Sequence, residues 1–139
     1  MTEAVSEGLT PEQVVDAFCA AAAKRDFDTA FQYLAEDVEY QNMPLPPVRG
    51  HQGVRDTLDA LLSLCTDSEW LVHRQLASGS TVMNERTDRF EMHGRWLDLP
   101  VAGVFEVQDG KIVLWRDYFD LPTIVNAMTP DDLATMGEA

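Results

Sequence analysis

The sequence has few of the features of secreted, membrane-spanning or metal-binding proteins. Its only two cysteines, Cys19 and Cys65, are each isolated within a helical pattern, which favours buried, reduced thiols in a cytoplasmic protein over a disulfide. No apolar run approaches the roughly 20 residues that a membrane span needs. The first ten residues are polar and acidic, so we expect no signal peptide.

Basic residues are also scarce. Ten Lys and Arg stand against 24 Asp and Glu, which gives a formal net charge of −14 over 139 residues. Because phosphate backbones require a basic surface, this charge argues against a nucleic-acid partner. It also leaves no basic face for an anionic membrane. The acidity favours solubility and does not by itself select a substrate.

Several common catalytic motifs are missing. The sequence has no Gly-rich phosphate loop, no nucleophile elbow and no catalytic Cys–His string. His51, His73 and His93 have no metal-ligand spacing with one another or with a cysteine, which argues against a metal site. We expect His93, in a turn, and the Asp131-Asp132 pair to be exposed to solvent. Chemistry would therefore have to come from other side chains.

Helical patterns come first in the chain and strand patterns follow. Thr10, Pro11 and Gln13 form a capping box with proline in the first turn, which predicts a helix that runs to about Lys24. Two further helical segments lie at 26–34 and 50–64. Strands are expected at 38–42, 70–75, 81–91, 96–107 and 111–119, a short helix at 121–128, and a frayed end over the last ten residues.

This order of elements is typical of an α+β fold. We predict one domain over residues 1–139, with an ordered core at about 11–128. Its curved, mixed or antiparallel sheet should form a cone, with the three N-terminal helices packed on the concave side. The strands should be joined by turns at Gly79-Ser80, His93-Gly94 and Asp109-Gly110. A pocket is expected between the concave face and the helices.

Two short strings place carboxylates inside strands. Side chains alternate along a strand, so Arg86 and Asp88 share one face, and Asp117 shares a face with Trp115 and Phe119. If both faces turn into one pocket, that pocket holds two carboxylates and one guanidinium. A like-charged pair in an apolar setting tends to hold a proton, which is the starting material for acid–base catalysis.

The residues alone leave other interpretations open. Arg86 and Asp88 fit an ion pair on a solvated sheet slightly better than a site. Asp117 fits either interpretation, since its neighbours on the same face are apolar. Tyr40 and Asn42 share a face of the strand at 38–42, where a hydrogen-bonding role in the fold is the simpler interpretation.

An apolar row should form the wall beside these residues. It runs along the strand at 96–107 and is interrupted only by Gly103. With apolar side chains from other segments, it predicts a hydrophobic substrate. The expected substrate-binding residues are Leu45, Leu61, Phe90, Leu99, Val101, Trp115 and Phe119.

Longer strings resemble those of a known family. They are Tyr40-Gln41-Asn42-Met43-Pro44-Leu45-Pro46-Pro47, Glu85-Arg86-Thr87-Asp88, Gly103-Val104-Phe105, Gly110-Lys111-Ile112 and Trp115-Arg116-Asp117-Tyr118-Phe119-Asp120. On these strings the chain resembles the limonene-1,2-epoxide hydrolase family, within the nuclear-transport-factor-2-like superfamily of cone-shaped α+β folds. The resemblance covers about residues 11–128.

The resemblance implies roles for five residues. Asp117 would be the base, Asp88 the acid and Arg86 the group between them, while Tyr40 and Asn42 would help to hold a water. It implies one-step hydrolysis of a hydrophobic, cyclic epoxide to a vicinal diol, with no metal or organic cofactor, by a homodimer. Alternatives on the same fold are an epoxide-opening cyclase, a steroid-isomerase-like enzyme and a non-catalytic small-molecule-binding module.

Overall fold

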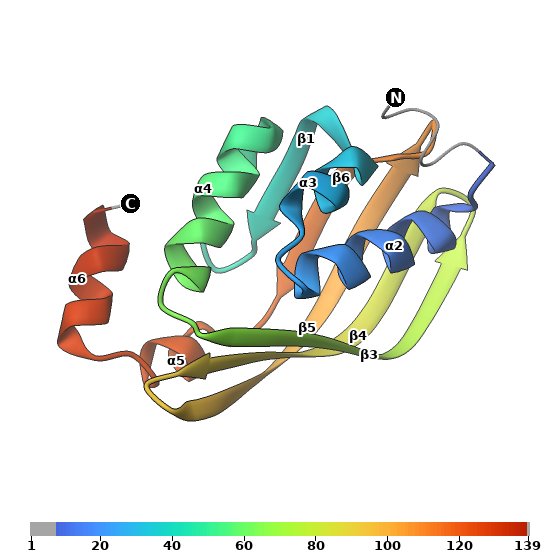
Figure 1. The fold of residues 1–139 in the computed structure, drawn as a ribbon. Coiled ribbons are helices and arrows are strands. Elements are labelled where there is room, and N and C mark those ends of the chain that lie inside the picture. Colours follow the sequence, from blue (N-terminus) through green and yellow to red (C-terminus); the bar gives the residue numbers. More distant parts are fainter. Residues whose placement is uncertain (1–7, 139) are drawn as a thin grey trace.

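Helices α2, α3 and α4 precede four consecutive long strands along the chain, as expected for an α+β fold (Figure 1). The structure is a computed structural model and describes residues 8–138. Its elements are α2 (Pro11–Ala23), α3 (Phe27–Ala30), a 3-10 helix (Phe31–Tyr33), β1 (Leu34–Asn42), β2 (Val48–Arg49), α4 (Gly50–Leu62), β3 (Asp67–Ser78), β4 (Thr81–Met92), β5 (Arg95–Gln108), β6 (Lys111–Tyr118), α5 (Leu121–Val125) and α6 (Pro130–Glu138).

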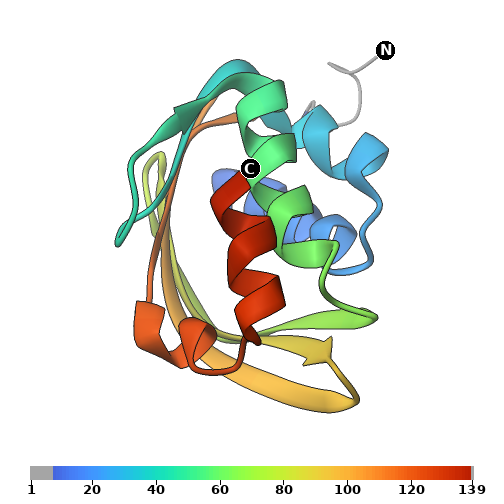
Figure 2. The same cartoon turned by 90° about the vertical axis from the view of Figure 1, so that its left-hand side faces the viewer.

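The six strands form one mixed sheet in the order β2-β1-β6-β5-β4-β3. β1 pairs parallel to β6, and the other neighbouring pairs are antiparallel. The sheet is strongly curved and unclosed, and α2, α3 and α4 cover its concave side (Figures 1 and 2). The predicted fold class is therefore confirmed.

Local sequence explains where elements begin and turn. The Thr10 side chain accepts from the Gln13 backbone N–H, and the Gln13 side chain accepts from the Thr10 backbone N–H, so the predicted capping box starts α2. In the β5–β6 hairpin, Asp109 and Gly110 both have positive φ, at 52° and 75°. Paired positive φ values match the twist of flanking strands and make this a tight two-residue hairpin.

An aromatic cluster fills the centre of the core. Trp115 is fully buried on β6 and stacks on Tyr40 at 3.9 Å between ring centroids. Phe18 of α2 packs edge-on against the same indole at 4.9 Å, and Phe105 of β5 stacks at 6.2 Å. This cluster joins helix α2 to three neighbouring strands of the sheet. Cys19 and Cys65 are free and buried, as expected.

The prediction for the C-terminal segment was wrong. Residues 130–138 form helix α6 instead of a frayed end, and the ordered core does not stop at about 128. Asp132, expected in solvent, is only 6% exposed and accepts from the backbone N–H of Thr129 at 2.9 Å and from His93 at 2.7 Å. A contact from the distant β4–β5 turn, which no local pattern shows, thus holds the start of this helix.

Strand lengths also differ from expectation. The strand expected at 70–75 runs from Asp67 to Ser78, and a two-residue strand, β2, follows the proline-rich loop. Glu39 and Tyr40 of β1 pair with β2, so that short strand returns the chain to the sheet edge before α4.

Candidate active site

The predicted carboxylates and guanidinium meet on the concave face. β4 presents Arg86 and Asp88, which are 1% and 5% exposed, and β6 presents Asp117, which is 5% exposed. β5 lies between these two strands, and its Gly103 pairs with Asn84 on one side and Asp117 on the other. Because Gly103 has no side chain, the groups on either side can reach each other across β5. The surface ion pair, which the residues alone slightly favoured, is excluded by this burial.

Arg86 joins the two carboxylates by hydrogen bonds. Its Nε and Nη2 donate to Oδ1 and Oδ2 of Asp88, each at 3.0 Å, in a bidentate pair. Nη2 also donates to Oδ2 of Asp117 at 3.0 Å. The other oxygen of Asp117 accepts from the indole Nε1 of Trp115 at 2.9 Å. Both oxygens of each carboxylate therefore have a donor, and one guanidinium fixes their relative position.

Charge balance in this triad favours a single shared proton. Burial raises the pKa of Asp88, Arg86 opposes that shift, and the charge of Asp117 adds to it. Burial opposes the charge on Arg86, but Asp117 and Asp88 together raise its pKa, so the guanidinium remains charged. Two ionised carboxylates beside one guanidinium would leave a buried net charge of about −1, and one proton removes it.

Gly103 has no side chain where Arg86 needs space. A Cβ built on it would lie 2.4 Å from Nη1 of Arg86 and 2.7 Å from Oδ1 of Asn84. Gly103→Ala should therefore displace the guanidinium, lower the thermal midpoint of unfolding by several degrees and reduce activity at least about tenfold. Thermal denaturation and steady-state kinetics test this. Ala102→Val adds volume at an exposed neighbouring position and should change neither; equal effects would contradict the steric role.

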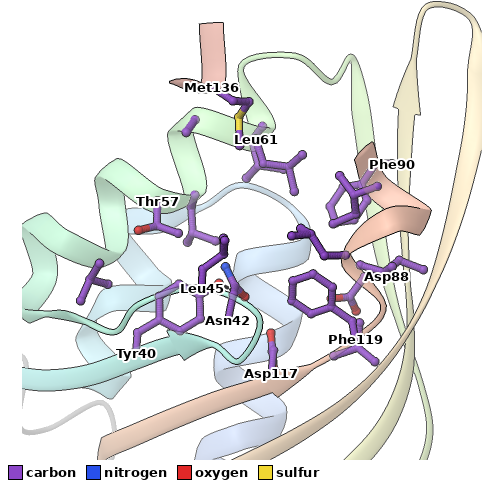
Figure 3. Close-up of a pocket in the computed structure, with 18 of the residues that line it drawn as sticks. Tyr40, Asn42, Leu45, Thr57, Leu61, Asp88, Phe90, Asp117, Phe119 and Met136 are labelled. Atoms are coloured by element: carbon purple, nitrogen blue, oxygen red, sulfur yellow. Dashed lines mark hydrogen bonds between the residues drawn. The ribbon is translucent and has the colours of Figure 1, made fainter. Parts of the chain in front are cut away.

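Tyr40 and Asn42 lie beside the triad on β1. The Tyr40 hydroxyl donates to Oδ1 of Asn42 at 2.9 Å, so the amide nitrogen of Asn42 is left to donate elsewhere. Asn42 pairs with Asp117 in the β1–β6 register. Burial raises the pKa of Tyr40, which keeps its hydroxyl protonated. Figure 3 shows both residues facing the same space as Asp117. The structure thus brings all five predicted catalytic residues together.

A cavity of about 610 Å3 opens in front of the carboxylates (Figure 3). Asp88, Asp117, Tyr40 and Asn42 lie on its wall, whereas Arg86 lies behind the carboxylates. All seven predicted substrate-binding residues line it, namely Leu45, Leu61, Phe90, Leu99, Val101, Trp115 and Phe119. The wall is mainly apolar, so a few polar groups converge at one end of a hydrophobic space, as in many small-molecule sites.

Sequence reasoning missed part of the cavity wall. Trp70 of β3 lines the cavity, pairs with Asp88 in the sheet register and lies against the guanidinium, whose carbon is 5.2 Å from the indole centroid. Extending the expected strand register across to β3 could have found it. The other missed side chains are Val48 of β2, several from α4, and six from the C-terminal segment, namely Leu121, Ile124, Val125, Met128, Leu133 and Met136. Leu133 and Met136 were missed because the last ten residues were expected to fray.

Helix α6 supplies Leu133 and Met136 to the wall and lies beside α4 (Figure 2). Its first turn depends on Asp132, whose pKa is lowered by the Thr129 backbone N–H and by His93. That contribution to stability is present above about pH 4 and is lost as pH falls through the lowered pKa.

Asp132→Ala should speed amide hydrogen exchange in α6 and raise KM for an apolar substrate a few-fold.

Asp131→Ala is the matched control for this prediction, because Asp131 is exposed in the same turn and the substitution removes the same charge. Asp131→Ala should leave the amide exchange rate in α6 and the KM near the values of the original protein. Equal exchange rates in the two variants would show that the His93–Asp132 contact does not hold α6 in place.

Neither a metal-binding cluster nor a membrane-spanning helix is found within residues 8–138. No three or more His, Cys, Asp or Glu side chains there are placed to hold a metal ion together. No helix in the same part of the chain is long and apolar enough to cross a membrane.

The comparison with known proteins decides the family. Residues 9–130 match the model of the limonene-1,2-epoxide hydrolase catalytic domain. The chain belongs to the limonene-1,2-epoxide hydrolase family. Membership confirms the resemblance seen in the sequence and makes this chain an enzyme of the epoxide hydrolase class.

Two relatives named as epoxide hydrolases agree with this family, and a third structure shares the fold alone. The chain is 38% identical over 107 residues to epoxide hydrolase EphG of Mycobacterium tuberculosis. The aligned region covers 77% of this chain and 71% of that protein. It is also similar to the solved structure of an M. tuberculosis LEH-like epoxide hydrolase, with a TM-score of 0.73, 32% identity and coverage of 93% and 96% of the two chains. TerC, co-crystallised with polyporic acid, shares the fold at 18% identity, with a TM-score of 0.76 over 84% and 97% of the chains.

Proposed function

We propose that this enzyme hydrolyses a hydrophobic, cyclic epoxide to a vicinal diol in one step, without a covalent intermediate. The observation that carries the proposal is the single guanidinium bound at 3.0 Å to two buried carboxylates, both of which face an apolar cavity. Family membership supports epoxide hydrolysis; the mechanism and the substrate class are our inference from the site.

Asp117 acts as the general base in this proposal. Its ionised carboxylate accepts from Arg86 and Trp115, two donors that cannot themselves take up a proton. A water in the cavity would donate one proton to Asp117 and its other proton to the Tyr40 hydroxyl oxygen, while the Asn42 amide nitrogen donates to the water oxygen. The water oxygen then forms a bond to one ring carbon from the face opposite the breaking C–O bond.

Asp88 acts as the general acid. Burial raises the pKa of this carboxyl, which favours the protonated state that the step requires. As the C–O bond breaks, its electron pair goes to the ring oxygen and the proton of Asp88 neutralises it. The triad holds one proton before and after the step, first on Asp88 and then on Asp117, so no net charge is created in the cavity. Acid and base assistance would each contribute roughly 10²–10⁴-fold.

The apolar wall supports the substrate class. A cavity of about 610 Å3 lies within the range typical of small-molecule sites, and the polar groups gather where the ring would react. The reaction as written uses only side chains of this chain and water. A cytoplasmic location remains a prediction from the sequence.

A panel assay tests the proposed function. Limonene 1,2-epoxide, cyclohexene oxide, styrene oxide and a sterol epoxide are incubated with the protein, and diols are separated by chromatography. We expect diol from at least one cyclic, apolar epoxide. Cyclic ethers formed from hydroxy-epoxides, in which an internal hydroxyl opens the epoxide, would indicate a cyclase. Migration of a double bond in a ketosteroid would indicate an isomerase. Binding of an epoxide without turnover would indicate a non-catalytic module. Each of these results without diol would contradict the proposal.

We further propose a homodimer, as the resemblance implied. Large apolar side chains are exposed on the outer face of the sheet, which supports an interface there: Leu71, Leu76, Met83 and Tyr118. Light scattering on the eluting protein should give about twice the chain mass of 15.6 kDa. A mass equal to one chain at micromolar concentration would contradict the dimer.

A further inference from the structure

A second polar path leaves the triad and ends at the protein surface. Nη1 of Arg86 donates to Oδ1 of Asn84 at 3.0 Å, and Nδ2 of Asn84 donates to Oε1 of Gln75 at 3.0 Å. Nε2 of Gln75 then donates to Oδ1 of Asp16, an exposed residue of α2, at 2.8 Å. None of these three side chains lines the cavity. The path therefore reaches Arg86 from the side that the substrate does not touch.

The path has a fixed direction. A carboxylate only accepts hydrogen bonds, so Asp16 requires Gln75 to present its nitrogen. That orientation turns Oε1 of Gln75 toward Asn84, so Asn84 must donate a hydrogen bond to it from Nδ2. The oxygen of Asn84 then necessarily faces Arg86. An exposed carboxylate thus orients two amides, and the second presents a neutral acceptor to a guanidinium that is 1% exposed.

We propose that Asn84 is a positioning residue for Arg86, and that Gln75 and Asp16 hold Asn84 in the orientation this requires. The two carboxylates take hydrogen bonds from Nε and Nη2, while Asn84 takes one from Nη1. This third contact fixes the guanidinium plane, so that Nη2 can donate hydrogen bonds to Asp88 and Asp117 at the same time. The inference rests on the proposed acid–base function of those two carboxylates.

The neutrality of Asn84 is as important as its geometry. A carboxylate at this position would accept from Nη1 equally well but would add a third negative charge beside one positive charge. Because an additional negative charge disfavours ionisation of its neighbours, the pKa of Asp88 would rise further. Asn84→Asp therefore keeps the shape and the hydrogen bond while it changes the charge balance of the triad.

Asn84→Asp should lower kcat/KM at pH 7 at least about tenfold and move the alkaline limb of its pH profile, where Asp88 ionises, upward by about one unit. The substrate is whichever epoxide of the panel the original protein turns over fastest. Gln108→Glu is the control, since it adds one negative charge at an exposed position at the end of β5. It should leave the profile in place. A purely structural role for Asn84 would lower activity without moving that limb.

A second set of variants acts at the partly exposed end of the path. Gln75→Leu keeps the side-chain volume but removes the acceptor for Asn84, so kcat should fall about three- to tenfold with KM little changed. In the double variant Gln75→Glu with Asp16→Asn, the new glutamate still accepts from Asn84 and the new asparagine supplies a donor to it. This double variant keeps the local charge and should return kcat to within about twofold of the original.

The outcomes separate this inference from the proposed function. If the original protein forms diol but Asn84→Asp behaves like Gln108→Glu, the positioning role is overturned. If Asn84→Asp fails to fold by circular dichroism, the Gln75 variants decide, and unchanged kcat in Gln75→Leu overturns the role. If the original protein opens no epoxide, the proposed function fails by itself. In that case, ¹³C carboxyl NMR titration of Asp88 decides, and an unshifted pKa in Asn84→Asp overturns the inference.

Discussion

Asp117→Asn should reduce kcat/KM for epoxide hydrolysis by at least about a thousandfold, because an amide cannot take the proton of the attacking water. The asparagine has nearly the same shape, so the cavity keeps its dimensions. The substitution should also lower stability, because Arg86 and Trp115 both donate to Asp117 and an amide has only one oxygen to accept from them. We therefore expect a measurably lower but still cooperative unfolding transition.

Steady-state kinetics and circular dichroism on the same samples measure both effects. Asp98→Asn is the matched control, because Asp98 lies on the neighbouring strand β5 with its side chain 62% exposed. It makes the same substitution and should keep full activity. Activity of Asp117→Asn within tenfold of the original, with the fold intact, would remove Asp117 as the base.

Arg86→Leu should be the most damaging substitution for stability. It leaves Asp88 and Asp117 buried beside each other without the cation that pairs with both, and removing one partner from a buried charge network costs about 3–5 kcal/mol. In the variant, burial raises the pKa of Asp88 without the opposing effect of Arg86, so its folded-state pKa lies above the unfolded value of about 3.9. The loss should therefore be small at low pH, where this carboxyl is protonated, and should grow as pH rises through its raised pKa.

Urea denaturation at pH 5 and pH 7.5 tests this dependence, and hydrolysis should be undetectable at either pH. Arg74→Leu on the adjacent strand β3 is the control, since the Arg74 side chain is 78% exposed and pairs with Glu85 at the surface. Its stability should follow that of the original protein at both pH values. An Arg86→Leu variant equally destabilised at pH 5 and 7.5 would mean that packing, rather than uncompensated charge, makes Arg86 necessary.

Much of the fold could be predicted because its signals are local. The capping box at Thr10, the period-two alternation along β4 and the paired turn residues Asp109-Gly110 depend only on neighbours in the chain. The same alternation placed Arg86 with Asp88 and Asp117 with Trp115. Alternation could not decide which face was buried, so the residues alone left a surface ion pair open, and only the longer family strings favoured a site.

The missed features depend on contacts between distant segments. Helix α6 has a weak local pattern and is held by a hydrogen bond from His93, 39 residues away along the chain. Trp70 reaches the triad only because β3 pairs with β4 in a particular register. The path through Asn84 and Gln75 likewise joins three elements, and single-strand patterns cannot show which amide faces which partner. Long-range register and side-chain orientation therefore remained beyond the sequence.

A single-turnover reaction in ¹⁸O-labelled water, with enzyme in excess over a cyclic epoxide, tests one-step hydrolysis most directly. If the water held by Asp117 attacks the ring carbon itself, the diol formed in that first turnover carries the label, and the protein gains none. If instead a carboxylate attacked carbon and its ester were then hydrolysed, the first diol would carry unlabelled oxygen from the protein, and ¹⁸O would appear in an aspartate. Unlabelled first-turnover diol would contradict the proposed mechanism.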